Sequence, residues 1–209
     1  MDNDLSALVM SLLPVLVAGG MLILGLAFAY FNRQRRRQAW TELAERTGLT
    51  FEPGGFLGGG RVTGNYRGYD LRLDTFTRRH GRSSTTYTRI VLSLSNPTSL
   101  ELALSNEGVF GKLGKLLGAQ DIQTGDEELD RRFVVKGQPA EAIVTLLTAG
   151  GLRYRLLETP SSFKLELKNQ QLYYEQRGAE RNVDHLQSTL TLLSELAAAA
   201  ERRRSSTRW

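Results

Sequence analysis

The densest group of side chains suited to binding a ligand lies in residues 78–84, whose sequence is RRHGRSS. Arg78, Arg79, His80 and Arg82 can each donate hydrogen bonds, and guanidinium groups pair well with phosphate or carboxylate. The segment joins two predicted strands, so we expect it at the tip of a hairpin. We therefore predict a site for a phosphate or an anionic lipid headgroup here. A solvated loop tip is the alternative.

The chain lacks the side chains that metal-dependent or thiol chemistry would need. The chain has two histidines and no cysteine, and His80 and His185 are far apart in the sequence. A zinc or iron site needs several convergent ligands, so no metal site is predicted. The acidic residues 121–130 lack the alternating oxygen ligands and central glycine of a calcium loop. Without cysteine there is neither a disulfide nor a thiolate nucleophile.

The glycine-rich segments do not match the known phosphate-binding or nucleophile motifs. No G-x-S-x-G is present, which excludes a nucleophile elbow. Residues 58–60 precede a predicted strand, whereas a dinucleotide fingerprint opens a helix. Residues 111–115, GKLGK, lack the spacing of a phosphate loop, and Leu116 stands where Ser or Thr is needed. We predict no cofactor, and we favour a non-enzymatic role over an enzymatic one.

The net charge of +5 comes from the two ends of the chain. Residues 38–201 hold 19 of the 27 Lys and Arg and 20 of the 22 Asp and Glu, a net charge of −1. A basic face for nucleic acid is therefore not predicted. We expect both clusters to contact anionic lipids of the inner leaflet, although the second could instead be a frayed helix end. The first cluster is Arg33, Arg35, Arg36 and Arg37, and the second is Arg202, Arg203, Arg204, Arg208 and Trp209.

Residues 5–32 contain no charged side chain. About 20 apolar residues are enough to cross a bilayer as a helix, so the segment predicts a transmembrane anchor. Asp2 and Asp4 precede it, and arginines follow it. Because basic residues beside a span tend to stay cytoplasmic, we predict a single-pass protein of the cell membrane with its N-terminus outside. A cleaved signal peptide is the alternative, but it would need a basic start and a shorter apolar core.

The rest of the chain predicts strands and helices that do not alternate regularly. Apolar residues at every second position predict strands at 69–77, 85–95, 100–105 and 163–168. Further strands are expected at 61–67, at 131–136, around the apolar run at 133–135, and at 171–177. Helices are expected at 38–47, 109–117, from Pro139 to the glycine at 150, and at 183–202. Residues 120–130 are expected to form a loop, and residues 152–157 suit either a helix or a strand.

This order predicts an α+β fold, with an N-terminal transmembrane helix followed by an antiparallel sheet of about seven strands that has helices on one face. The first four strands are expected to pair as a meander. A pleckstrin-homology-like barrel is a second option. The predicted parts are an outer N-terminus at 1–4, the span at 5–32, a basic collar and helix at 33–48, a cytoplasmic domain at 49–201 and a basic tail at 202–209.

Four segments together resemble a group of uncharacterised bacterial single-pass membrane-anchored proteins of unknown function. The segments are WxxLAxxTGL at 40–49, GxYRG at 64–68, TTYTR at 85–89 and DRRFVVKG at 130–137. The resemblance covers most of residues 40–196. It implies a membrane-anchored domain and carries no catalytic or binding residue over to this chain.

Three functions are consistent with these patterns. The favoured one is a membrane-anchored cytoplasmic binding or scaffold module, whose partners would be an unknown protein and the lipid bilayer with its anionic inner leaflet. The second is a membrane-associated enzyme acting on a phosphorylated or lipidic substrate, which would need a deep pocket with convergent polar groups. The third is a structural subunit, or homo-oligomer, assembled through the helix at 5–32, where Gly25-x-x-x-Ala29 is a small-residue contact motif.

Overall fold

The structure is a computed structural model that describes residues 2–55, 59–106, 121–160 and 163–202, with the backbone alone for residues 2–16 and residue 80. The chain divides into two compact units, residues 1–38 and residues 39–209, and each is considered by itself. Helix α1, Asp2–Thr47, supplies all of the first unit's described residues and the opening turns of the second.

The transmembrane prediction for residues 5–32 is wrong, because no helix in the described part of the chain is long and apolar enough to cross a membrane. The predicted single-pass topology and cell-membrane location depended on this span, so both predictions are wrong as well.

The first unit has no core of its own among the described side chains. Nine large apolar side chains of α1 are at least half exposed, and the buried core begins only at Ala39. The exposed set is Val17, Met21, Leu22, Ile23, Leu24, Leu26, Phe28, Tyr30 and Phe31.

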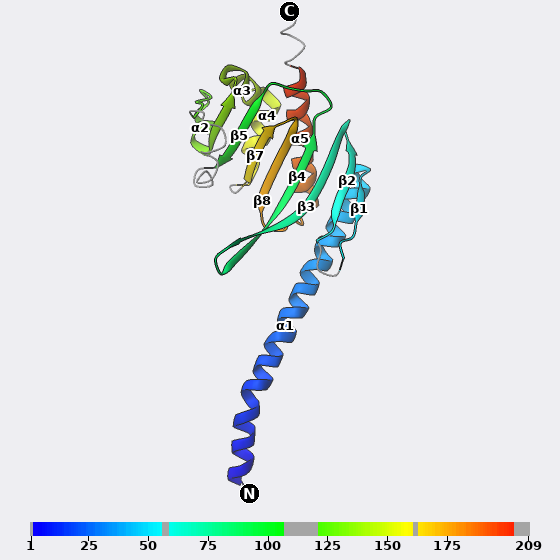
Figure 1. The fold of residues 1–209 in the computed structure, drawn as a ribbon, viewed down its shortest axis with the longest axis vertical. Coiled ribbons are helices and arrows are strands. Elements are labelled where there is room, and N and C mark those ends of the chain that lie inside the picture. Colours follow the sequence, from blue (N-terminus) through cyan, green and yellow to red (C-terminus); the bar gives the residue numbers. More distant parts are fainter. Residues whose placement is uncertain (1, 56–58, 107–120, 161–162, 203–209) are drawn as a thin grey trace, which may run out of the picture. The chain divides into compact units, whose positions relative to one another are not determined.

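The second unit is built on one antiparallel sheet of eight described strands, which confirms the α+β prediction. The spatial order is β1-β2-β3-β4-β8-β7-β5-β6 (Figure 1). The sheet is open, with β1 and β6 as its edges, and is not the alternative closed barrel. The strands are β1 Thr50–Glu52, β2 Arg61–Tyr66, β3 Tyr69–His80, β4 Ser83–Ser93, β5 Glu101–Asn106, β6 Phe133–Gln138, β7 Phe163–Lys168 and β8 Gln171–Arg177.

The predicted meander holds for β2, β3 and β4 but not for β5. Strand β8 pairs with β4, and β5 lies between β7 and β6. The β7–β8 hairpin turns at Asn169 and Gln170, both with positive φ as a tight hairpin turn requires. A turn of this kind is visible locally, whereas the docking of that hairpin beside β4 depends on the packing of the whole sheet.

The described residues of this unit form four further helices: α2 Glu127–Arg132, α3 Ala140–Leu147, α4 Gly150–Leu157 and α5 Val183–Arg202. Two differ from expectation. Helix α2 takes the place of a predicted loop and strand start, because the Asp126 side chain caps it by accepting hydrogen bonds from the N–H groups of Glu128 and Leu129. Residues 152–157, ambiguous in sequence, belong to helix α4. The helix predicted at 109–117 lies outside the described residues.

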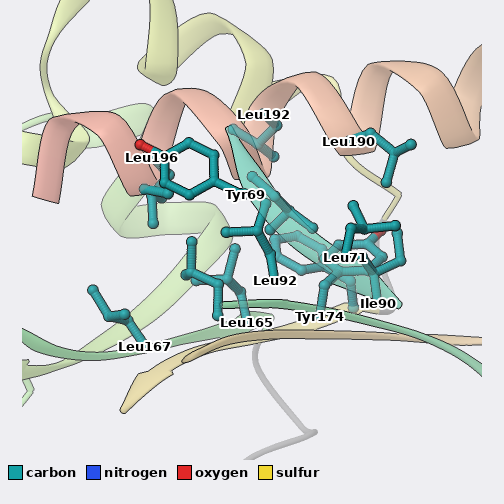
Figure 2. Close-up of a cluster of buried hydrophobic side chains, with 14 of the residues drawn as sticks. Tyr69, Leu71, Ile90, Leu92, Leu165, Leu167, Tyr174, Leu190, Leu192 and Leu196 are labelled. Atoms are coloured by element: carbon teal, nitrogen blue, oxygen red, sulfur yellow. The ribbon is translucent and has the colours of Figure 1, made fainter. Parts of the chain in front are cut away.

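Alternate side chains of the strands form the core beneath α5. Figure 2 shows Leu190, Leu192 and Leu196 of α5 above Tyr69, Leu71, Ile90, Leu92, Leu165, Leu167 and Tyr174 of the sheet. The period of two along each strand puts the sheet residues on one face, and all ten side chains are less than a tenth exposed. Trp40, at the start of the second unit, is fully buried in the same cluster.

Candidate functional site

Strands β3 and β4 continue as a two-stranded ribbon beyond the rest of the sheet (Figure 1). Strand β2 pairs with β3 only as far as Asp74, and β8 pairs with β4 only from Tyr87 onward. Residues 75–86 therefore belong to the β3–β4 pair alone among the described strands: residues 77–80 pair with 83–86, and Thr75 and Phe76 pair with Thr88 and Tyr87. We call this segment the ribbon. Its outer edges present backbone N–H and C=O groups that no described strand pairs, although the Thr86 carbonyl accepts a hydrogen bond from the Gly178 N–H at 2.8 Å.

One side of the ribbon is aromatic and structurally engaged. The rings of Phe76 and Tyr87 stack with centroids 5.5 Å apart. The Arg78 guanidinium lies 5.0 Å from the first ring centroid and 5.2 Å from the second. It also donates two hydrogen bonds to the Glu175 carboxylate, at 2.8 and 3.0 Å. Arg78 therefore fastens the base of the ribbon to β8.

The other side carries hydroxyls and a guanidinium. Thr77 and Thr86 face each other with their hydroxyl oxygens 3.3 Å apart, and Arg79 lies opposite Ser84 in the next pair. Arg79 and Ser84 are exposed. Neither Arg79 nor Arg82 has an ion pair within the described residues.

The four residues predicted as one anion site are therefore divided. Arg78 and Arg79 lie on opposite faces, because successive strand residues alternate. Arg82 is exposed in the turn, and His80 ends β3 opposite Ser83. Arg79 and Arg82 are therefore the exposed arginines near the tip, whereas Arg78 is hydrogen-bonded to Glu175 at the base of the ribbon.

The predicted lipid-contact residues are only partly described. Arg33, Arg35, Arg36 and Arg37 lie on α1 in the first unit, and Arg202 is the exposed last residue of α5. Arg203, Arg204, Arg208 and Trp209 lie outside the described residues, so this contact stays a prediction.

A row of alternating charges crosses the sheet face opposite α5. Asp74, Arg89, Glu175 and Lys164 occupy successive positions on β3, β4, β8 and β7. Burial by itself would raise the pKa of Asp74, but the hydrogen bonds and charges of Arg89 and Arg72 together outweigh it and hold that pKa below its usual value. The opposite charges in this row neutralise one another, so we interpret the row as stabilising the sheet and not as a binding site.

A second polar network is centred on Glu180, in the loop between β8 and α5. Its carboxylate accepts hydrogen bonds from the backbone N–H groups of Arg181 and Asn182, at 2.7 and 2.8 Å, and from the Gln176 amide at 2.9 Å. His185 Nδ1 lies 3.2 Å from the same carboxylate. His185 and these backbone donors, working against partial burial, lower the pKa of Glu180 to about 2.

The loop containing Glu180 also joins three elements through its backbone. The Glu180 carbonyl accepts a hydrogen bond from the Trp40 indole at 3.1 Å. Its N–H donates to the Thr88 hydroxyl at 2.8 Å, and that hydroxyl donates to the Gly178 carbonyl at 2.8 Å. Glu180 therefore holds α1, β4 and the start of α5 together.

Beside this network, a cavity of about 250 Å³ lies between α4 and α5. His185 lines it, and the Nε2 atom of that ring is buried without a hydrogen-bond partner among the described residues. The remaining lining residues are Arg155, Glu158, Thr159, Asp184, Ser188, Thr189 and Leu192. No group of three or more metal-ligating side chains forms in the described part of the chain.

Sequence reasoning considered His185 only as a metal ligand and did not find this cavity. Its lining comes from residues 155–159 and 184–192, which no motif connects. One signal was present: an acidic residue, Glu180, stands five positions before a histidine at a predicted helix start. That spacing is too common to indicate a site without the packing of α4 on α5.

Comparisons with known proteins do not supply a family. No family model matches the chain, and no curated protein matches it. A solved structure, the crystal structure of the mycobacterial trehalose monomycolate transport factor A, TtfA, is similar over 80% of this chain and 93% of that chain. The sequence identity is 13% and the TM-score 0.49. A likeness this distant leaves the function of this chain open.

Proposed function

We propose that the second unit is a non-enzymatic binding module that recognises an extended acidic segment of a protein partner through the ribbon. The observation that carries this proposal is the two-stranded extension at 75–86, which has unpaired outer edges among the described strands and two exposed arginines at its tip.

The backbone edges favour a peptide over an isolated anion. An extended segment can add to an exposed strand edge through main-chain hydrogen bonds, while side chains provide selectivity. The free edge of β3 at 75–80 spans about 20 Å, enough for a segment of about six residues. A lipid headgroup or free phosphate would use the arginines but not the edge.

The arginines favour acidic side chains on that segment. Arg79 and Arg82 are exposed, and guanidinium groups form paired hydrogen bonds with carboxylates. Arg79 shares its face with the hydroxyls of Thr77, Ser84 and Thr86, which can also donate hydrogen bonds to carboxylate oxygens.

The proposal is tested with full-length protein and an array of acidic, extended peptides. We expect micromolar binding by some peptides that weakens at least about tenfold in the charge-reversal variant R79E/R82E. The matched control is R131E/R177E, which reverses two other exposed arginines. A photo-crosslinking side chain placed at Thr85 should capture the peptide, and one placed at Arg131 should not.

Vesicles of phosphatidylglycerol separate a peptide site from a lipid site. The proposal fails if the vesicles bind and the peptides do not, or if R79E/R82E and R131E/R177E weaken peptide binding equally. The second result would indicate a general charge effect without a site.

A further inference from the structure

The cavity between α4 and α5 carries an inference independent of the ribbon. At about 250 Å³ it is large enough for a small organic molecule, and its lining is dominated by polar side chains from two helices. The hydrogen-bonding capacity that these side chains have left over defines what such a molecule must offer.

Both threonine hydroxyls of the lining already donate to backbone carbonyls. The Thr159 hydroxyl donates to the Leu156 carbonyl, and the Thr189 hydroxyl donates to the His185 carbonyl at 2.9 Å. Each oxygen keeps lone pairs that can accept a hydrogen bond. Both hydroxyls therefore act toward the cavity as acceptors.

His185 adds a third acceptor. Nδ1 of His185 lies 3.2 Å from the Glu180 carboxylate, so the neutral tautomer that donates to this carboxylate carries its proton on Nδ1. Nε2 is then left with a lone pair. It is buried and has no partner in the described structure, and an unsatisfied buried acceptor is costly.

The charges of the lining also leave a negative excess. Arg155 is paired with Glu195 at 2.9 Å, and Asp184 with Arg46 at 2.8 Å. Glu158 has no ion pair with any described residue. It also follows the last turn of α4, and the C-terminal end of a helix favours a positive charge nearby.

We propose that this cavity binds a small primary ammonium compound. An ammonium group has three N–H donors and no acceptor. It matches the acceptors of Thr159, Thr189 and His185 and the unpaired carboxylate of Glu158. The size of the cavity limits the rest of the molecule to a short chain.

The test is an NMR titration of the full-length protein with n-propylamine, which is an ammonium ion at neutral pH. We expect saturable binding in the millimolar range, with shifts at the cavity residues and at the side-chain nitrogens of His185. Two probes of the same length separate the contributions. n-Propanol keeps a donor without charge and should bind more weakly, and propionate, with the opposite charge, should not bind.

Variants assign the binding to the cavity. E158Q, which preserves the shape of the side chain, should raise the Kd about tenfold. The control E127Q removes an exposed carboxylate of α2, outside the cavity lining, and should leave the Kd unchanged. H185F keeps a ring but no acceptor and should also weaken binding, with circular dichroism reporting that the fold is retained.

Binding of n-propylamine at the cavity can be tested separately from peptide binding at the ribbon. R79E/R82E should bind n-propylamine as the unaltered protein does. The inference is overturned if n-propylamine shows no saturable shift, if propionate binds as well as n-propylamine, or if E158Q and E127Q behave alike.

Discussion

Asp74 on β3 and Arg89 on β4 are directly opposite each other, and the guanidinium donates two hydrogen bonds to the carboxylate, Nε to Oδ1 at 2.9 Å and Nη2 to Oδ2 at 2.7 Å. Arg72 adds a third contact to the same carboxylate at 2.7 Å. The Asp74 side chain is only 9% exposed although it lies on the face opposite α5. This pair joins the two longest strands immediately before they leave the sheet as the ribbon.

Replacing Asp74 should therefore destabilise the fold. D74N removes the charge that offsets Arg89, and we expect the free energy of unfolding to fall by about 2 kcal/mol. D70N, a change at an exposed position on the same strand, should cost less than about 0.5 kcal/mol. Urea denaturation of the full-length protein measures both. Equal effects of the two variants would show that the Asp74–Arg89 pair adds nothing.

Glu180 should make stability depend on pH in the acid range. Its pKa is about 2 in the folded protein against an ordinary value of 4.5. A depressed carboxyl pKa stabilises the fold above about pH 4.5, and that contribution is lost as the pH falls from about 4.5 to about 2. The full contribution is up to about 3 kcal/mol. Melting temperatures between about pH 2 and pH 7 should show this loss.

The variant E180Q tests the assignment of that pH dependence. It should be less stable than the unaltered protein at about pH 7 and should show a flatter decline toward acid. E127Q, at an exposed position of α2, should keep the original profile. If E180Q keeps the same slope as the unaltered protein, other carboxyls cause the acid sensitivity.

Substitution by alanine should have opposite effects on stability at two glycines. At Gly137 φ is +149°, and an added Cβ would lie 2.0 Å from the Glu101 carbonyl oxygen and 2.6 Å from Ile143 Cδ1. G137A should therefore lower the free energy of unfolding by at least about 2 kcal/mol. Gly151 lies in α4 with nothing within 4 Å of an added Cβ, so G151A should stabilise by about 0.5 kcal/mol. Thermal unfolding of both variants checks the signs, and a stable G137A would contradict the close β5–β6 approach.

Neighbouring arginines of the ribbon should differ in their effect on stability. R78A removes the contacts with Phe76, Tyr87 and Glu175, and should lower the free energy of unfolding by about 1 kcal/mol. R79A removes no described ion pair or ring contact and should leave the melting temperature unchanged. Differential scanning calorimetry compares the two variants. If R79A were the more destabilising, the assignment of the two faces would be reversed.

Much of the fold could be predicted because it depends on local patterns. The alternation of Tyr69, Leu71 and Leu73 identified β3 and its buried face, and the apolar stripe of α5 identified the helix that covers the sheet. Turn residues located the β2–β3 and β7–β8 hairpins. These patterns show which face of an element is buried, but they do not show which elements meet.

The arrangement of elements and of the sites depended on the tertiary structure. Strand alternation already puts Arg78 and Arg79 on opposite faces, but only the docking of β8 against β4 gave Arg78 its partner Glu175. The structure also differs from the prediction for residues 5–32, because no helix in the described part of the chain is long and apolar enough to cross a membrane.

The sequence alone determined the fold class, the buried strand faces and the final helix, because side-chain periodicity is a property of one segment at a time. Only the tertiary structure decided the strand order, the roles of the individual arginines and the cavity beside His185. Those features come from contacts between residues up to 140 positions apart, such as Trp40 and Glu180, and the free energy of such contacts depends on the packing of the whole domain.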